Sequence, residues 1–192
     1  MLQRVTKFAF DFDDTMNRFF IVKLMFIEAR YGVKLPPEFL KKTVVEKSGV
    51  LTLAQYETVQ EIVWGHRFYT MLAEAEQGMV ECLTSLLDRK ANVSVVTSRD
   101  GDVLEWAKEW LANLGLSVPT YGVGYGKSKA QVLREIGAEV FVDDDWPKLN
   151  DLVGVVPHIF RYSRPFNQTD ELPREIRSAE SWWWLREVFA GL

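Results

Sequence analysis

Three short apolar runs, each followed by polar or acidic residues, constrain the fold of this chain more than any other feature. They are Phe8–Phe10 before Asp11, Val93–Val96 before Thr97, and Glu139–Val142 before Asp143. A later run of the same kind spans Val155–Phe160. Runs this short and apolar are typical of strands whose two faces are both covered by other elements.

Helical patterns separate these runs. Residues 81–87, 103–111 and 130–136 carry apolar residues at helical spacing, with Asp100 as a candidate N-cap of the second helix and Gly137 as a stop for the third. Alternating strands and helices imply right-handed crossovers and a parallel sheet. The sequence therefore predicts a Rossmann-like three-layer α/β/α sandwich around a central parallel sheet.

The first two predicted strands are far apart in the sequence. From Asp11 to Thr97 is 86 positions, whereas a simple βαβ unit needs about 30 residues. The surplus has helical patterns at 20–31, 37–46 and 52–64, and Thr52 with Gln55 fits a capping box. We therefore expect an α/β core formed by residues 1–16 and 78–192, with residues 17–77 as a helical insert.

Charge and composition exclude several classes of protein. The chain has 23 Lys and Arg against 27 Asp and Glu, without a long basic run, so we expect no nucleic acid polymer as a partner. A single cysteine, Cys82, and two histidines allow neither an internal disulfide nor a Cys/His zinc site. We expect Cys82 in the core. With no signal-peptide core before Asp11 and Lys23 interrupting the next apolar run, we expect a cytoplasmic protein without a membrane partner.

The residues that end the predicted strands form the candidate site, because ligands of parallel sheets bind beyond the carboxyl ends of the strands. The set comprises Asp11, Asp13, Asp14, Thr15, Thr97, Ser98, Arg99, Asp143, Asp144 and Asp145, with Lys127 and Lys129 shortly before the last three. Carboxylates brought together would repel one another unless a cation joined them, and oxygen ligands suit Mg²⁺. A divalent metal together with a phosphate is the expected ligand.

In this order, the four motifs resemble the haloacid dehalogenase (HAD) superfamily. Its pattern is a strand ending in DxDx(T/V), a strand ending in Ser or Thr, a lysine, and a strand ending in paired acids, and the resemblance covers nearly the whole chain. It implies the HAD fold, with the helical insert at the place where one class of these enzymes carries a cap.

Chemistry and resemblance assign the roles together. Asp11 would be the nucleophile, since a carboxylate can form an acyl phosphate, and Asp13 would be the general acid and base. An acid at this second position resembles the phosphatases and phosphomutases. The resemblance also implies phosphoryl contacts from Thr97 and Lys129, and a Mg²⁺ site of Asp11, Asp143 and the Asp13 carbonyl, with Asp144 close by.

Two of these assignments have competitors. Ser98 takes the place of Thr97 if the strand ends one residue later, although the apolar run favours Thr97. Lys127 competes with Lys129, which is preferred because it opens the predicted helix. The final helix, with Trp182–Trp184, is expected to pack on the sheet with one ring exposed, the alternative being a partner surface.

The predicted function is a Mg²⁺-dependent phosphatase that acts on a small phosphorylated metabolite through an aspartyl phosphate. Candidate substrate contacts are Asn17, Arg18 and Arg99, and the insert is expected to determine specificity. Thr97–Arg99 and Arg164–Asn167 also resemble the deoxyribonucleotidase branch, which implies a nucleoside monophosphate as one substrate. The alternatives are a sugar-phosphate phosphatase, a phosphomutase, or a catalytically silent binding module. A homo-oligomer has no support in the sequence.

Overall fold

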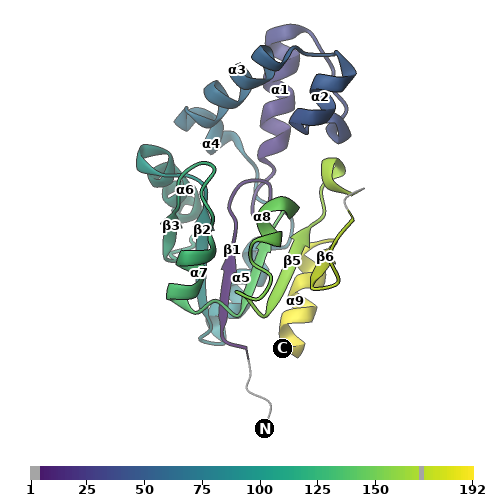
Figure 1. Cartoon of the computed structure of the whole chain (residues 1–192). Helices are drawn as coiled ribbons and strands as arrows, with labels where there is room; N and C mark the ends of the chain where they lie inside the picture. Colours follow the sequence, from purple (N-terminus) through teal and green to yellow (C-terminus); the bar gives the residue numbers. More distant parts are fainter. Residues whose placement is uncertain (1–4, 169–170) are drawn as a thin grey trace.

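The computed structural model describes residues 5–168 and 171–192. Its central sheet joins six strands, all parallel, in the order β3-β2-β1-β4-β5-β6 (Figure 1). The strands are β1 (Lys7–Phe10), β2 (Asn92–Thr97), β3 (Thr120–Gly122), β4 (Val140–Asp143), β5 (His158–Tyr162) and β6 (Ile176–Ala179). The predicted parallel sheet is confirmed.

Helices cover both faces of the sheet. One face carries α5 (Met79–Asp88), α6 (Gly101–Asn113) and α9 (Trp182–Gly191), and the other carries α7 (Ala130–Ile136) and α8 (Trp146–Asn150). Buried side chains alternate along the strands to meet both layers: Phe8 and Phe10 join the cluster around α5 and α9, and Ala9 joins the cluster around α7. The fold is therefore the predicted three-layer sandwich, and Cys82 lies in its core as expected.

The register of the central strands positions the site. Phe10 lies opposite Val95 of β2 and Val142 of β4, and the Asp11 amide donates to the Val142 carbonyl at 2.8 Å. The strands therefore end close together. Asp11 leaves β1 between the end of β2 and the end of β4, where Asp143 stands.

Residues between β1 and α5 form a helical unit above the carboxyl ends of the strands (Figure 1). It contains α1 (Phe19–Tyr31), the 3-10 turn η1 (Pro37–Phe39), α2 (Lys42–Ser48), α3 (Leu53–Trp64) and α4 (Arg67–Leu72). These elements share an apolar cluster separate from the two beside the sheet, and the connecting segments meet in an antiparallel bridge between Asn17 and Ala75. We therefore propose residues 17–77 as a unit of their own, which we call the insert.

Local capping chemistry accounts for several helix ends. At α3, Gln55 donates its amide to the Thr52 hydroxyl at 3.2 Å and its side chain accepts from the Thr52 amide at 2.9 Å, which is the predicted capping box. Gly137 ends α7 at a φ of 64°, as expected of a left-handed C-cap. Asp100 stands at the N-cap of α6, but its side chain makes no capping hydrogen bond there.

Two boundaries differ from the sequence prediction, and two strands were not predicted. The helix expected over 37–46 is two pieces, because Lys41 has an extended backbone with a ψ of 135°. The strand expected from Val155 begins at His158, since Pro157 has no amide to donate to a ladder. The edge strands β3 and β6 were not predicted, because each is short and only partly buried and so carries no apolar run.

The C-terminal aromatic cluster divides its three rings between different surroundings. Trp182 is fully buried and donates its indole N–H to the Thr15 carbonyl at 3.0 Å, while Trp184 packs against Phe160. Trp183 remains 41% exposed. The expected packing on the sheet with one exposed ring is confirmed.

The helices are short. The longest in the described part of the chain, α1 and α6, have 13 residues each. No helix formed by residues 5–168 or 171–192 has the length and apolar character needed to cross a membrane.

Candidate active site

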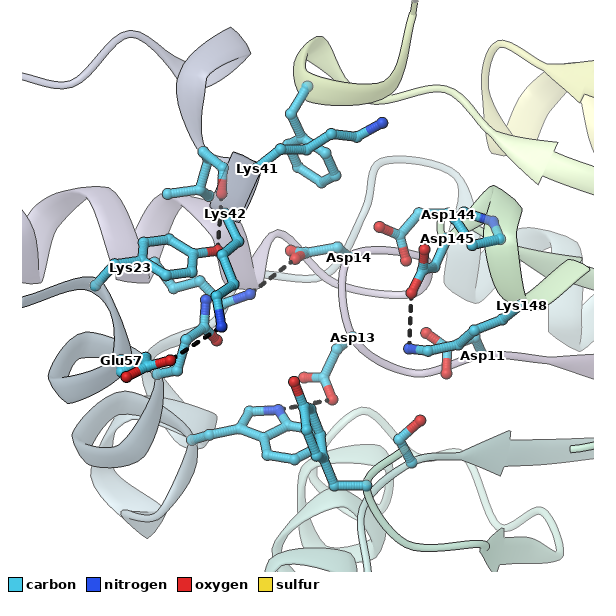
Figure 2. A pocket seen from close by; sticks show the side chains of 18 of the residues that line it. Asp11, Asp13, Asp14, Lys23, Lys41, Lys42, Glu57, Asp144, Asp145 and Lys148 are labelled. Carbon is cyan, nitrogen blue, oxygen red and sulfur yellow. Dashed lines mark hydrogen bonds and ion pairs between the residues drawn. The ribbon is translucent and has the colours of Figure 1, made fainter. Parts of the chain in front are cut away.

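A cavity of about 960 Å³ lies between the carboxyl ends of the strands and the insert (Figure 2). The core supplies Asp11, Asp13 and Ser98 to its wall, and the insert supplies Lys23, Tyr56 and Trp64. The core thus contributes most of the acids and the insert most of the lysines, while aromatic rings from both line the cavity. This is the edge at which ligands of parallel sheets bind.

Lys129 joins two of the acids at the base of the site. Its ammonium group contacts Asp11 Oδ1 and lies 2.7 Å from Asp143 Oδ2. The Lys129 side chain is only 2% exposed, and Asp143 is held further by the Asp145 amide, which donates to its other oxygen at 2.8 Å. A lysine buried at the first residue before α7 therefore connects the ends of β1 and β4.

Burial and crowding of like charges shift the pKa values of these groups. Burial raises the pKa of Asp11 to about 7, with Lys129 opposing the shift and Asp143 adding to it. Asp144 has a pKa well above its usual range, first because it is buried and then because Asp14, Asp143 and Asp11 lie near it. The two carboxylates beside Lys129 outweigh its burial and raise its pKa. These groups form a cluster of acids around the buried ammonium group of Lys129.

Asp11, Asp143 and Asp144 have the properties of a metal site. One carboxylate oxygen from each lies within 4.8 Å of the others. Mg²⁺ prefers oxygen ligands, and a divalent cation among these carboxylates would favour their ionised forms. The donor set fits the expected metal. The carboxylate of Asp13 is engaged elsewhere, so only its main-chain carbonyl remains a candidate ligand, as the resemblance implied.

Asp13 is held by a bidentate ion pair. Arg99 donates through Nη2 to Oδ1 at 2.7 Å and through Nε to Oδ2 at 2.8 Å, and the Trp64 indole adds a hydrogen bond to Oδ2 at 3.3 Å. Burial acts to raise the pKa of Asp13, but the charge and hydrogen bonds of Arg99 outweigh it and the pKa lies below the usual value. The carboxylate still faces the cavity (Figure 2).

Asp14 and Arg164 fasten the connection between core and insert. Asp14 has a positive φ of 58°, and its carboxylate accepts from the Phe20 amide and pairs with Lys23 at 3.3 Å. Arg164 donates to the carbonyls of Asp14 and Asn17, the latter at 2.8 Å, and pairs with Glu76. One buried guanidinium therefore binds both chain segments that enter and leave the insert.

The chain resembles solved structures over its whole length. No protein-family model matches it, and no curated protein matches it by sequence. A haloacid dehalogenase-like hydrolase from Streptococcus pneumoniae has a TM-score of 0.62 at 13% identity, over 97% of this chain and 98% of its own. A predicted phosphatase from Clostridium acetobutylicum has a TM-score of 0.65 at 12% identity, over 98% and 100%. A HAD family hydrolase from Deinococcus radiodurans, solved with bound phosphate and sodium, has a TM-score of 0.58 at 13% identity, over 97% and 96%.

The chain has the HAD fold. The resemblance inferred from the four sequence motifs is thereby supported in three dimensions, because the likeness extends across both the sandwich and the insert. Identities this low establish the architecture, and the chemistry has to be argued from the side chains.

The structure separates the competing residues at the HAD motifs. Lys129 lies with the acids, whereas Lys127 is exposed near Gly124. Ser98 lines the cavity with a hydroxyl that has no hydrogen-bond partner, but Thr97 is fully buried and its hydroxyl accepts from the Arg99 amide at 3.3 Å. Ser98 is therefore the better candidate for a phosphate contact, although the strand pattern favoured Thr97.

The three expected substrate contacts do not line the cavity. Asn17 is buried, and its side-chain oxygen accepts from the amides of Asp14 and Phe19. Arg18 pairs with Glu74 and Glu76 at the connection to the insert. Arg99 is fully buried against Asp13. Asn17 and Arg99 are buried, whereas the Arg18 side chain is 45% exposed and pairs with acids at the connection to the insert, so none of the three forms part of the cavity wall.

Sequence reasoning missed other residues at the cavity. Lys148 of α8 lines it and pairs with Asp145 at 2.9 Å, and the neighbouring Asp143, Asp145 and Asp11 outweigh its burial and raise its pKa. Its position one helical turn after an acidic residue was an available signal. Tyr125 also lines the cavity, with its ring 5.5 Å from that of Trp64. No sequence pattern relates those two rings, since they come from a core loop and the insert.

Proposed function

We propose that this protein is a Mg²⁺-dependent phosphomonoester hydrolase that acts through an aspartyl phosphate on Asp11. The observation that carries the proposal is the placement of Asp11 beside a buried lysine and two further carboxylates, with Asp13 facing the same cavity. A silent binding module would have no use for so many buried carboxylates in one place, since their mutual repulsion costs stability.

In the first half of the reaction, a carboxylate oxygen of Asp11 attacks the phosphorus atom. The bond from phosphorus to the ester oxygen breaks, and Asp13 donates a proton to that oxygen. In the second half, Asp13 takes a proton from water, the water oxygen attacks the phosphorus atom, and phosphate leaves Asp11. The pairing of Asp13 with Arg99 favours the ionised form, which is the form required in this second half.

A lysine and a hydroxyl near Asp11 would bind the phosphoryl oxygens. Lys129 contacts Asp11 and favours its ionised form, while the Ser98 hydroxyl, which lacks a partner within the protein, is available to donate to a phosphoryl oxygen. Mg²⁺ held by Asp11, Asp143 and Asp144 would supply charge neutralisation for the transferred group. The insert would cover the site and exclude bulk water during transfer.

The substrate is proposed to be a small phosphorylated metabolite. Tyr56, Trp64 and Tyr125 line the cavity and could accept a flat leaving group, which keeps nucleoside monophosphates among the candidates. A sugar phosphate would use the hydrogen-bonding groups of the same wall. A phosphomutase would share the first half-reaction and then return the phosphoryl group to a substrate hydroxyl.

The test is phosphate release from nucleoside monophosphates, sugar phosphates and p-nitrophenyl phosphate in Mg²⁺, with Asp11→Asn as the inactive variant and the exposed Asp151→Asn as its matched control. We expect Asp11→Asn to lose at least about a thousandfold in kcat while keeping its fold, as judged by an unchanged circular dichroism spectrum, because it removes the nucleophile. Near-normal activity of Asp11→Asn would exclude the proposed mechanism. An isomerised phosphate ester as product would identify a mutase, and an inactive wild type would favour the binding module.

A further inference from the structure

We propose that Arg99 is the residue that positions Asp13 and that it makes this position depend on the seating of the insert. The inference rests on the proposed function, in which Asp13 is the general acid and base. In this proposal Arg99 acts on the reaction by fixing the carboxylate of Asp13. Thr70 and Trp64 of the insert help to hold Arg99 and Asp13 in place.

Arg99 is fixed to the core at one end and to Asp13 at the other. Its backbone follows β2, and its amide donates to the Thr97 hydroxyl. The side chain is completely buried, and its planar fork takes both carboxylate oxygens of Asp13. A bidentate pair fixes the plane of a carboxylate as well as its distance, which a single hydrogen bond does not.

The remaining edge of the same guanidinium reaches the insert. Nη1 donates to the Thr70 hydroxyl at 2.8 Å, and Thr70 on α4 is itself fully buried. Trp64 at the end of α3 donates to Asp13 directly. The Arg99 guanidinium lies 5.1 Å from the ring centre of Phe12 of the core and also 5.1 Å from that of Phe19 of the insert. Core and insert thus hold one guanidinium between them.

This arrangement couples two events. When the insert moves away, Arg99 loses its Thr70 partner and Asp13 loses the Trp64 indole. Water would then reach the Nη1 group of Arg99 and the Asp13 carboxylate, and because water holds neither group in one orientation, the guanidinium and the carboxylate paired with it would no longer be fixed toward the cavity. Asp13 therefore has its present orientation toward the cavity when the insert is seated, so proton transfer is restricted to the covered site.

A direct substrate contact does not explain Arg99. The side chain has no exposed surface, and its Nε, Nη1 and Nη2 groups all donate to protein atoms. Neutralising the charge of Asp13 does not explain Arg99 either, because a lysine could do that. A lysine could not bind both oxygens of Asp13 and the Thr70 hydroxyl at once, as the planar guanidinium does. The contact with Thr70 is what distinguishes a positioning role linked to the insert.

The experiment compares Thr70→Val with Thr70→Ser. Valine keeps the shape of threonine and removes the hydroxyl, whereas serine keeps the hydroxyl. We expect Thr70→Val to lower kcat about tenfold with KM changed less than about twofold, because a buried hydrogen bond to a charged group is lost. Thr70→Ser should retain most of the activity. Trp64→Phe, which removes the indole donor to Asp13 and keeps an aromatic ring, should also lower kcat.

The same change in an Asp13→Asn background tests whether the effect passes through Asp13. With p-nitrophenyl phosphate, whose leaving group needs no proton, single-turnover release of p-nitrophenol should remain measurable in Asp13→Asn and should not be slowed by adding Thr70→Val. An equal additional loss in that background would overturn the proposal, as would equal effects of Thr70→Val and Thr70→Ser or unchanged kinetics of Thr70→Val.

A structural readout separates this inference from the proposed function. A crystal structure of Thr70→Val should show the Asp13 carboxylate rotated from its position in the wild type, with Thr70→Ser unchanged. This holds even for a wild type that hydrolyses no ester in the panel, in which case the proposed function fails while the coupling stands. An unmoved Asp13 in Thr70→Val would overturn the coupling.

Discussion

The core edge of the site and the insert hold their charged groups in opposite ways. In the core, Lys129 contacts both Asp11 and Asp143, and the three side chains are 2%, 9% and 1% exposed, respectively. In the insert, Lys42 and Glu57 lie 2.9 Å apart with side chains 54% and 57% exposed, at the other wall of the same cavity (Figure 2). The first arrangement requires a defined geometry, and the second tolerates change.

The difference indicates a division of labour between the two regions. Groups that act on a phosphoryl group must keep their positions to within a fraction of an ångström, and strand ends in a covered sheet provide that rigidity. Groups that select the rest of the substrate need only a surface of suitable shape and charge. The insert, packed around its own apolar cluster, can supply such a surface without disturbing the strands.

The largest expected effect concerns the metal. Chelation with EDTA should abolish phosphate release, and Asp144→Asn should raise the Mg²⁺ concentration for half-maximal activity by about 10- to 100-fold, because one oxygen ligand loses its charge. Glu46→Gln, an exposed acid of the insert, is the matched control and should leave the Mg²⁺ dependence unchanged. Hydrolysis that persists in EDTA would place the chemistry outside this acidic cluster.

A smaller effect should distinguish the buried ion pairs of Lys129 from the exposed Lys42–Glu57 pair by their contributions to the free energy of unfolding. Lys129→Met leaves Asp11 and Asp143 buried without their cation, so urea unfolding in EDTA should show a loss of about 3–5 kcal/mol in the free energy of unfolding. Lys42→Met breaks an exposed pair and should cause no measurable change. Equal effects of the two substitutions would remove the contrast between core and insert.

The smallest expected effect tests whether the insert is a unit of its own. Val59 is fully buried in its cluster, and Val59→Ala should cost about 2 kcal/mol locally. Hydrogen exchange should then accelerate in α1 and α3 while β1 and β4 keep their protection. Val142→Ala in the sheet is the counterpart and should affect the whole chain. Uniform acceleration in Val59→Ala would show that the two regions unfold together and contradict the boundaries 17–77.

Much of the fold could be predicted from local sequence patterns. Phe8–Phe10 and Val140–Val142 are apolar on both faces, which is readable from sequence because both faces of a central strand are covered. Thr52 and Gln55 predicted the start of α3 because a capping box involves neighbours in the chain. The edge strands β3 and β6 lacked such a signal, because their burial depends on one neighbour and a few surrounding side chains.

The sequence by itself determined that acids, a hydroxyl residue and a lysine would meet at one edge of a parallel sheet, because the ends of such strands must converge. Only the tertiary structure decided that Ser98 rather than Thr97 faces the cavity, since a shift of one residue reverses the side of a strand. It also decided that Arg99 grips Asp13 and reaches Thr70, 29 positions away in the chain. Contacts of that kind depend on how two separately packed regions are seated on each other, which no local pattern encodes.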